Sequence, residues 1–156
     1  MPQAARHLLC TLCVKDSAVS ETSVEMNDLM FAALDHAIAS IENAGPLVPF
    51  TMTISKAGDK KLTRFALEML EQGLEAAQAH IQNEKENLKL YAIAWDGYIT
   101  IEGKKWDSIF VEAGELSTEQ GVILSQRYEK KGLFKRKNFP AGNPALIERP
   151  TSKLHT

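Results

Sequence analysis

Aromatic and basic side chains that could bind a ligand gather in the second half of the sequence. They are Trp95, Tyr98, Trp106, Arg127 and Tyr128. A fold that brings some of them together would form a concave pocket with aromatic walls, and pockets of this kind hold small molecules by apolar contact and a few polar groups. With a convergent acid or base the pocket would serve a small enzyme with a site assembled from distant residues. Without one it would only bind. The sequence assigns no residue a catalytic role.

A second group of side chains could bind a polyanion. Five cations follow Tyr128 in one short stretch, with Phe134 and Phe139 interleaved. The cations are Lys130, Lys131, Lys135, Arg136 and Lys137. Cations attract phosphate, and aromatic faces stack on unpaired bases. The alternative is the charged end of an edge strand, where Lys discourages pairing with another chain. A pI near 6.1 argues against a dedicated nucleic-acid binder, so nucleic acid is a disfavoured partner.

Cys10 and Cys13 form a Cys-x-x-Cys motif, with His7 three residues upstream. A closed zinc site needs four ligands, and the chain has no second pair of cysteines. A redox motif would be expected at a helix start that follows a strand, where the thiolate is stabilised, but no strand is evident upstream. We therefore expect no metal and no cofactor.

Two acidic patterns have simpler explanations than catalysis. Glu68, Glu71 and Glu75 form a stripe on the outward face of an expected helix, and solvated charge explains it. Asp107 and Glu112 resemble the metal-binding acids of restriction-type nucleases, but a glycine stands where that pattern needs a lysine. Five residues apart on a strand, the two acids also point to opposite faces. The chain has no glycine-rich phosphate loop, nucleophile elbow or His-Glu-x-x-His motif, which disfavours nucleotide binding, serine hydrolysis and zinc proteolysis.

Two amphipathic helices are expected to position these residues. The first spans roughly 23–44: a Thr-x-x-Glu capping box at Thr22 and Glu25 predicts its start, and Phe31 with Leu34 begins its apolar face. The second follows the apolar spacing from Leu67 to Ile81. A glycine inside a helix is unfavourable by about 1 kcal/mol relative to alanine. Gly73 therefore predicts a close packing contact.

Period-two alternation and turn residues predict the strands. They are 47–55, 60–65, 88–94, 98–101, 105–113 and 121–130. Asp96-Gly97 predicts a two-residue hairpin turn, because such a turn favours positive φ at both positions. Glu102-Gly103-Lys104 predicts a second tight turn. Strands joined so tightly must be antiparallel neighbours. The expected fold is α+β: an antiparallel sheet of about five or six strands with two amphipathic helices packed on one face.

The length of 156 residues fits a single domain with a core of its own. We expect an N-terminal extension at 1–20, whose order the sequence leaves open, one α+β domain at 21–147 and a frayed C-terminal tail at 148–156. Residues 21–119 carry eight Lys and Arg against seventeen Asp and Glu. Residues 120–156 carry eight against two. The body is therefore acidic, and the C-terminal part is basic.

Cellular location follows from what the sequence lacks. No apolar run is long enough to cross a membrane, and the seven apolar residues 8–14 are not followed by a small-residue cleavage site. We expect a cytoplasmic protein with reduced thiols and no membrane partner.

Four short strings occur in an order that resembles a group of small, uncharacterised bacterial single-domain proteins. They are Gly45-Pro46-Leu47-Val48-Pro49-Phe50, Trp95-Asp96-Gly97-Tyr98, Gln126-Arg127-Tyr128 and Gly142-Asn143-Pro144. The resemblance covers about residues 26–147 and implies a bacterial source and one domain, but no activity. A complete core pattern beside no assembled catalytic set favours a non-catalytic binding or protein-interaction module. We expect it to self-associate as a homodimer through a sheet edge or helix face, or to bind another protein.

Overall fold

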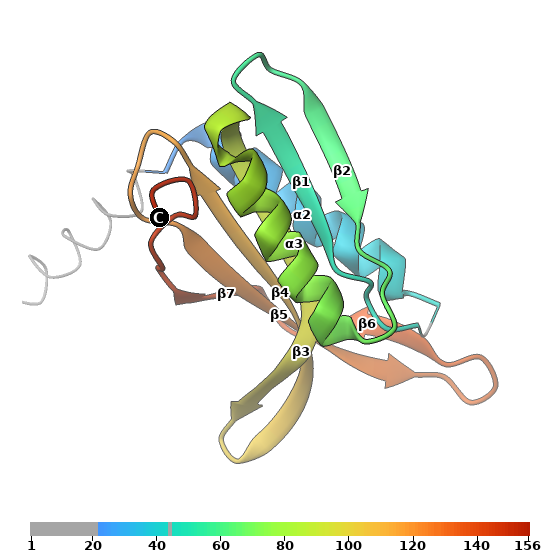
Figure 1. Cartoon of the computed structure of the whole chain (residues 1–156). Helices are drawn as coiled ribbons and strands as arrows, with labels where there is room; N and C mark the ends of the chain where they lie inside the picture. The colour runs from blue at the N-terminus through green and yellow to red at the C-terminus, as the bar shows by residue number, and fades with distance from the viewer. Residues whose placement is uncertain (1–21, 44) are drawn as a thin grey trace, which may run out of the picture.

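The computed structural model describes residues 22–43 and 45–156 (Figure 1). The elements in chain order are α2 (Val24–Ile41), β1 (Phe50–Ser55), β2 (Lys60–Arg64), α3 (Leu70–Glu84), the short 3-10 helix η1 (Lys85–Asn87), β3 (Leu88–Ile101), β4 (Lys104–Glu115), β5 (Val122–Lys131), β6 (Lys137–Pro140) and β7 (Ala145–Glu148). The predicted extension at 1–20 and its Cys10 and Cys13 lie outside the described residues. The metal and redox hypotheses for that motif therefore stay untested.

The strands form one antiparallel sheet of seven strands in the order β2-β1-β3-β4-β5-β6, and β7 also pairs with β5 (Figure 1). The α+β class and the antiparallel sheet are confirmed. Among the described residues, no helix has the length and apolar character that crossing a bilayer requires.

The two helices cover opposite faces of the sheet, not one face as the sequence predicted (Figure 1). Successive strand residues point to opposite faces. Ala92 and Ala94 of β3 are buried with α2, whereas Tyr91 and Ile93 are buried with α3. The sequence contains evidence for this arrangement, because residues 90–95 are all apolar and a strand that is buried on both faces has a continuous apolar run. We call the two sides the α2 face and the α3 face.

Helix α2 begins one residue later than its predicted capping box. The Ser23 hydroxyl accepts a hydrogen bond from the backbone N–H of Met26 at 3.0 Å and so caps the helix. Glu25 instead pairs with Lys89. Phe31, predicted to lie on the apolar face, is 46% exposed. The buried stripe of α2 is made mainly by small and unbranched side chains, which let the helix lie close to the sheet.

Strand β3 runs through Asp96-Gly97 without turning, which corrects the hairpin prediction. Gly97 pairs with Ser108 inside the β3–β4 ladder. A Cβ on Gly97 would lie 2.9 Å from Cε2 of Phe110, so the glycine makes room for that ring. The turn lies at Glu102 and Gly103, both with positive φ, where the sequence placed the second tight turn.

Close contacts fix helix α3 and the C-terminal tail against the rest of the fold. A Cβ on Gly73 would lie 2.6 Å from the carbonyl oxygen of Phe65, which confirms the predicted packing contact in α3. The C-terminal tail is docked and not frayed: Ser152 is fully buried, and its N–H donates to the carbonyl of Glu119. Leu154 packs in the apolar cluster under α3.

Candidate functional site

A cavity of about 340 Å³ opens where β3 extends beyond its neighbour β1. Its lining residues come from the loop before β1, from the start of α3 and from β3, β4, β5 and β6. They are Gly45, Pro46, Pro49, Leu70, Glu71, Leu74, Trp95, Asp96, Gly97, Tyr98, Asp107, Tyr128, Lys130 and Asn138. A cavity of this size can hold a small molecule.

The register of the sheet explains why space is left at this position. The β1–β3 ladder ends at Phe50 and Ala94, so from Trp95 onward β3 has a ladder partner only on its β4 side. The loop before β1 is tied across this free edge, because the backbone N–H of Leu47 donates to Oδ2 of Asp96 at 3.2 Å. The cavity is therefore built at the one stretch of β3 that the sheet leaves uncovered.

Asp96 and Tyr128 form the central polar pair of the cavity. The Tyr128 hydroxyl lies 2.9 Å and 3.0 Å from the two carboxylate oxygens of Asp96, to which it donates. Burial raises the pKa of the Asp96 carboxyl, although the hydrogen bonds from Leu47 and Tyr128 oppose the rise. Burial also raises the pKa of the Tyr128 phenol, and the Asp96 carboxylate raises it further. Tyr128 is therefore a hydrogen-bond donor at neutral pH.

The charges that line the cavity are mostly negative. Asp107 stands opposite Tyr98 on β3 and opposite Tyr128 on β5, which places the three side chains in a row on the α2 face. Its charge also contributes to the raised pKa of Asp96. Glu71 adds a third carboxylate from α3, and Lys130 is the single basic side chain in the lining. The cavity thus favours a positively charged guest.

Asn138 adds a buried acceptor to the same lining. Its Nδ2 donates to the carbonyl of Ile41 at 2.8 Å, which fixes the orientation of the amide because a carbonyl only accepts. The residue is 4% exposed. Its Oδ1 has no hydrogen-bond partner among the residues that the structure describes. A buried acceptor without a partner is unfavourable, and this oxygen is too deeply buried for a molecule in the cavity to contact it.

Three of the five predicted pocket residues line the cavity: Trp95, Tyr98 and Tyr128. The other two do not. Trp106 precedes Asp107 on β4 and therefore points to the α3 face, where the guanidinium carbon of Arg127 lies 4.7 Å from its ring centroid. The two form a cation–π pair with each other.

Sequence reasoning missed the polar residues of the cavity. Asp96 was assigned to a turn, Asp107 was considered only for a nuclease site, and Asn138 lies in a segment without periodicity. One signal could have found Asp107. Once the turn is placed at Glu102 and Gly103, counting back along both strands puts Tyr98 opposite Asp107, which the ladder has.

The five predicted anion-binding cations lie on one hairpin, formed by β5 and β6. Lys130 and Lys131 end β5, Lys137 begins β6, and Lys135 and Arg136 lie in the turn between them. Lys131 pairs with Glu129 at 3.2 Å. The Nζ of Lys137 lies 3.5 Å from Oε1 of Glu42, at the end of α2. Two of the five cations are therefore paired with acids, and Lys130, Lys135 and Arg136 have no ion pair among the described residues.

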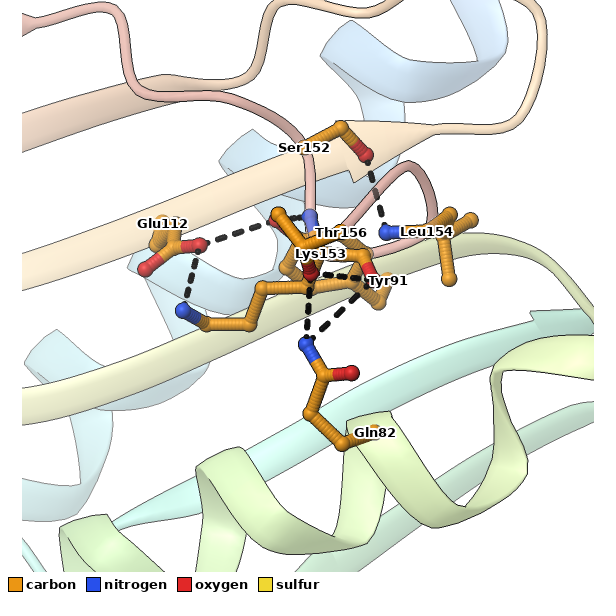
Figure 2. Close-up of polar contacts among 7 residues, drawn as sticks. All are labelled: Gln82, Tyr91, Glu112, Ser152, Lys153, Leu154 and Thr156. Carbon is orange, nitrogen blue, oxygen red and sulfur yellow. Dashed lines mark hydrogen bonds and ion pairs between the residues drawn. The ribbon is translucent and has the colours of Figure 1, made fainter.

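A second tyrosine–carboxylate pair lies on the α3 face, and it is closed. The Tyr91 hydroxyl donates to Oε1 of Glu112 at 2.8 Å, and the ammonium of Lys153 lies 3.4 Å from the same oxygen (Figure 2). The backbone N–H of Lys153 donates to the Tyr91 hydroxyl at 3.0 Å. Tyr91 is fully buried and Glu112 is 4% exposed. The pair joins the C-terminal segment to the sheet and has no room for a guest. Asp107 and Glu112 lie on opposite faces, as predicted.

No three His, Cys, Asp or Glu side chains in residues 22–43 and 45–156 gather closely enough to hold a metal ion. Comparisons of the chain with known protein families, with curated proteins and with solved structures find no match to any of them.

Proposed function

We propose that this chain is a non-catalytic binding module for a small organic cation, a protonated amine on an aromatic or apolar body. The binding site is the cavity at the free edge of β3. One observation carries the proposal: the lining combines aromatic side chains with three carboxylates and only one basic residue. An amine would contact the carboxylates while its apolar body packs against Tyr98 and the two prolines, and Trp95 borders the cavity from the α3 face.

The hydrogen-bonding capacity of the lining supports a guest with several N–H donors. Asp96 already accepts from Leu47 and Tyr128, and these bonds hold its carboxylate in place. Asp107 and Glu71 add further carboxylate oxygens to the lining. An ammonium group carries three donors and no acceptor, which matches a lining rich in acceptors. An anionic guest would face three like charges.

The cavity does hold the convergent acids that a catalytic site would need, Asp96 and Asp107, so the preference for binding depends on the other lining residues. The raised pKa of the Tyr128 phenol keeps it protonated, so it positions Asp96 and does not serve as a base. A nucleophile needs an adjacent base to activate it. None of the residues that line the cavity is a Ser, Thr, Cys or His.

Two probes of the same shape and opposite charge test the proposal. Phenethylamine is a cation at neutral pH, and phenylpropionate carries the same ring and spacer with a carboxylate. We expect the protein to bind the amine at least about tenfold more tightly, a difference of about 1.4 kcal/mol. Changes in tryptophan fluorescence and in amide chemical shifts around Trp95 report the binding. Equal affinity for both probes, or no binding of the amine, would overturn the proposal.

Asp96→Asn is the decisive variant, because Asn can still accept the hydrogen bonds from Tyr128 and Leu47 but carries no charge. A hydrogen bond to a charged group contributes about 1.5–3 kcal/mol, so we expect amine affinity to fall about tenfold or more. Asp35→Asn removes one carboxylate from the exposed side of α2 and is the matched control. Unchanged affinity in Asp96→Asn would place the amine elsewhere.

Self-association through a sheet edge or a helix face remains a separate proposal, and the β2 edge is a poor surface for it. Lys60, Lys61 and Arg64 lie on the edge strand β2. Like charges directly opposite one another disfavour pairing of two such edges. Light scattering across a range of protein concentrations measures the oligomeric state. A monomer at every concentration would contradict self-association and would leave the cavity proposal intact.

A further inference from the structure

The turn between β5 and β6 exposes two large apolar side chains almost completely. Leu133 is 94% exposed and Phe134 is 98% exposed, the highest values among the exposed large apolar residues of the described chain. Single exposed apolar residues are common on protein surfaces, but two adjacent ones at the end of a projecting hairpin indicate an interaction site. Figure 1 shows this hairpin extending away from the body of the molecule.

The backbone of the turn has a defined conformation, which fixes where Leu133 and Phe134 leave the chain. Gly132 has φ of 121°, a conformation that other residues rarely adopt, and a Cβ there would lie 2.5 Å from the carbonyl oxygen of Lys135. The base of the hairpin is tied to the end of α2, because Asn138 donates through Nδ2 to Ile41 and through its backbone N–H to Glu42. The apolar tip therefore needs little ordering when it binds.

A collar of positive charge surrounds the tip. The stretch 130–137 holds five Lys and Arg residues and no Asp or Glu; Lys131 pairs with Glu129 and Lys137 with Glu42, which leaves Lys130, Lys135 and Arg136 without an ion pair among the described residues. Long basic side chains beside an apolar tip are typical of elements that place apolar groups in a bilayer and keep their cations at the level of the lipid headgroups. Anionic lipids attract such cations within about a Debye length of the surface.

We propose that the β5–β6 hairpin docks the protein on an anionic phospholipid surface, with Leu133 and Phe134 inserted between the lipids and the five cations contacting the headgroups. This departs from the expectation of no membrane partner, which rested on spanning segments; a protein can bind a bilayer without crossing it. The proposal does not need a guest in the cavity, although Lys130 and Asn138 of the hairpin also line the cavity.

The arrangement of charge favours a flat membrane over a nucleic acid. Residues 21–119 carry nine more acidic than basic residues, so a long polyanion that wrapped around the body would be repelled. A projecting hairpin can reach a flat anionic surface while it holds the acidic body away. Leu133 is aliphatic and has no ring on which a base could stack, but it inserts readily into hydrocarbon.

Co-sedimentation of the full chain with lipid vesicles tests this. One set contains phosphatidylcholine alone, and in the other a third of the lipid is phosphatidylserine. We expect sedimentation with the anionic vesicles, weakening as salt is added, and little with the neutral ones. A fluorescent single-stranded oligonucleotide is tested in parallel. No sedimentation at low ionic strength, or binding of the oligonucleotide without binding of the vesicles, would overturn the proposal.

Two double variants separate the apolar and charged contributions. Leu133→Ser with Phe134→Ser removes the inserted groups, and Lys135→Glu with Arg136→Glu reverses two charges. Each is expected to lower vesicle affinity about tenfold or more. The controls change exposed residues that are distant in sequence from the hairpin. Val24→Ser with Phe31→Ser is the control for the apolar variant, and Lys60→Glu with Lys61→Glu is the control for the charge variant. Equal effects from tip and control variants would contradict docking through the hairpin.

The same variants test self-association through the tip. If wild-type protein is a dimer in light scattering and the Leu133→Ser, Phe134→Ser variant is a monomer without vesicles present, the tip is buried between copies. That result would overturn membrane docking. Circular dichroism spectra of all variants show that the fold is retained.

Discussion

Two tyrosine–carboxylate pairs lie on opposite faces of the same sheet and differ in what surrounds them. Tyr128 donates to Asp96 and Tyr91 donates to Glu112, at nearly the same distances. Asp96 borders a cavity, and burial raises its pKa. Glu112 is covered by the C-terminal segment, and Lys153 supplies its counter-charge.

The difference separates a structural carboxylate from an available one. A buried charge is tolerated when it is paired and hydrogen-bonded, and Oε1 of Glu112 has both an ion pair with Lys153 and a hydrogen bond from Tyr91. Asp96 accepts hydrogen bonds but has no ion pair among the described residues, so a bound cation would supply the missing counter-charge. The two pairs therefore have different roles: the C-terminal segment covers the Tyr91–Glu112 pair, whereas the Tyr128–Asp96 pair lines a cavity.

The largest expected effect is on the closed pair. Gly114→Ala would place a Cβ 2.5 Å from Cε1 of Tyr91 and 2.7 Å from the hydroxyl of Ser152. Both neighbours are fully buried, so we expect a loss of about 3 kcal/mol in the free energy of unfolding. Gly97→Ala is the counterpart near the open pair. It meets the ring of Phe110, which is only partly buried and can shift, so about 1 kcal/mol is expected. Urea denaturation measures both, and equal losses would contradict the comparison.

The two hydroxyl deletions should differ by a smaller amount. Tyr91→Phe removes one hydrogen bond to Glu112, which keeps its ion pair with Lys153, and leaves the N–H of Lys153 without its acceptor, so we expect a loss of about 2 kcal/mol. Tyr128→Phe leaves Asp96 with access to cavity water, and at most about 1 kcal/mol should be lost. The free energy of unfolding in urea is again the measurement. A larger loss for Tyr128→Phe would show that the cavity is not accessible to water.

The smallest expected effect is in the pH dependence of stability. The pKa of Asp96 is raised in the folded state, so between the ordinary value and the raised one the folded chain binds more protons than the unfolded chain. The contribution of Asp96 to stability is therefore fully present below the unfolded pKa and is lost as pH rises through the folded pKa. Asp96→Asn lacks this loss, so its stability relative to wild type should increase as pH rises. Denaturation of both proteins across a pH series measures the trend, and a decrease would contradict it.

The affinity for phenethylamine should increase with pH, whereas the contribution of Asp96 to stability decreases. A cation interacts with the ionised carboxylate, so phenethylamine affinity is expected to rise as pH increases through the raised pKa of Asp96. Titrations of wild type and Asp96→Asn at several pH values give the measurement. The variant should show a flatter profile, and identical profiles would separate Asp96 from the amine.

Local pattern in the sequence predicted both helices, strands β1, β2, β4 and β5, the α+β class, the position of the Glu102-Gly103 turn and the close contact at Gly73, because periodicity and turn chemistry act between near neighbours; it did not predict β6 or β7. Only tertiary structure decided that the helices cover opposite faces, that Asp96-Gly97 continues a strand and that Ser152 is buried. It also decided which of two like carboxylates stays open. These outcomes depend on where β1 ends beside β3 and on where the C-terminal segment docks, and such contacts join residues far apart in the chain.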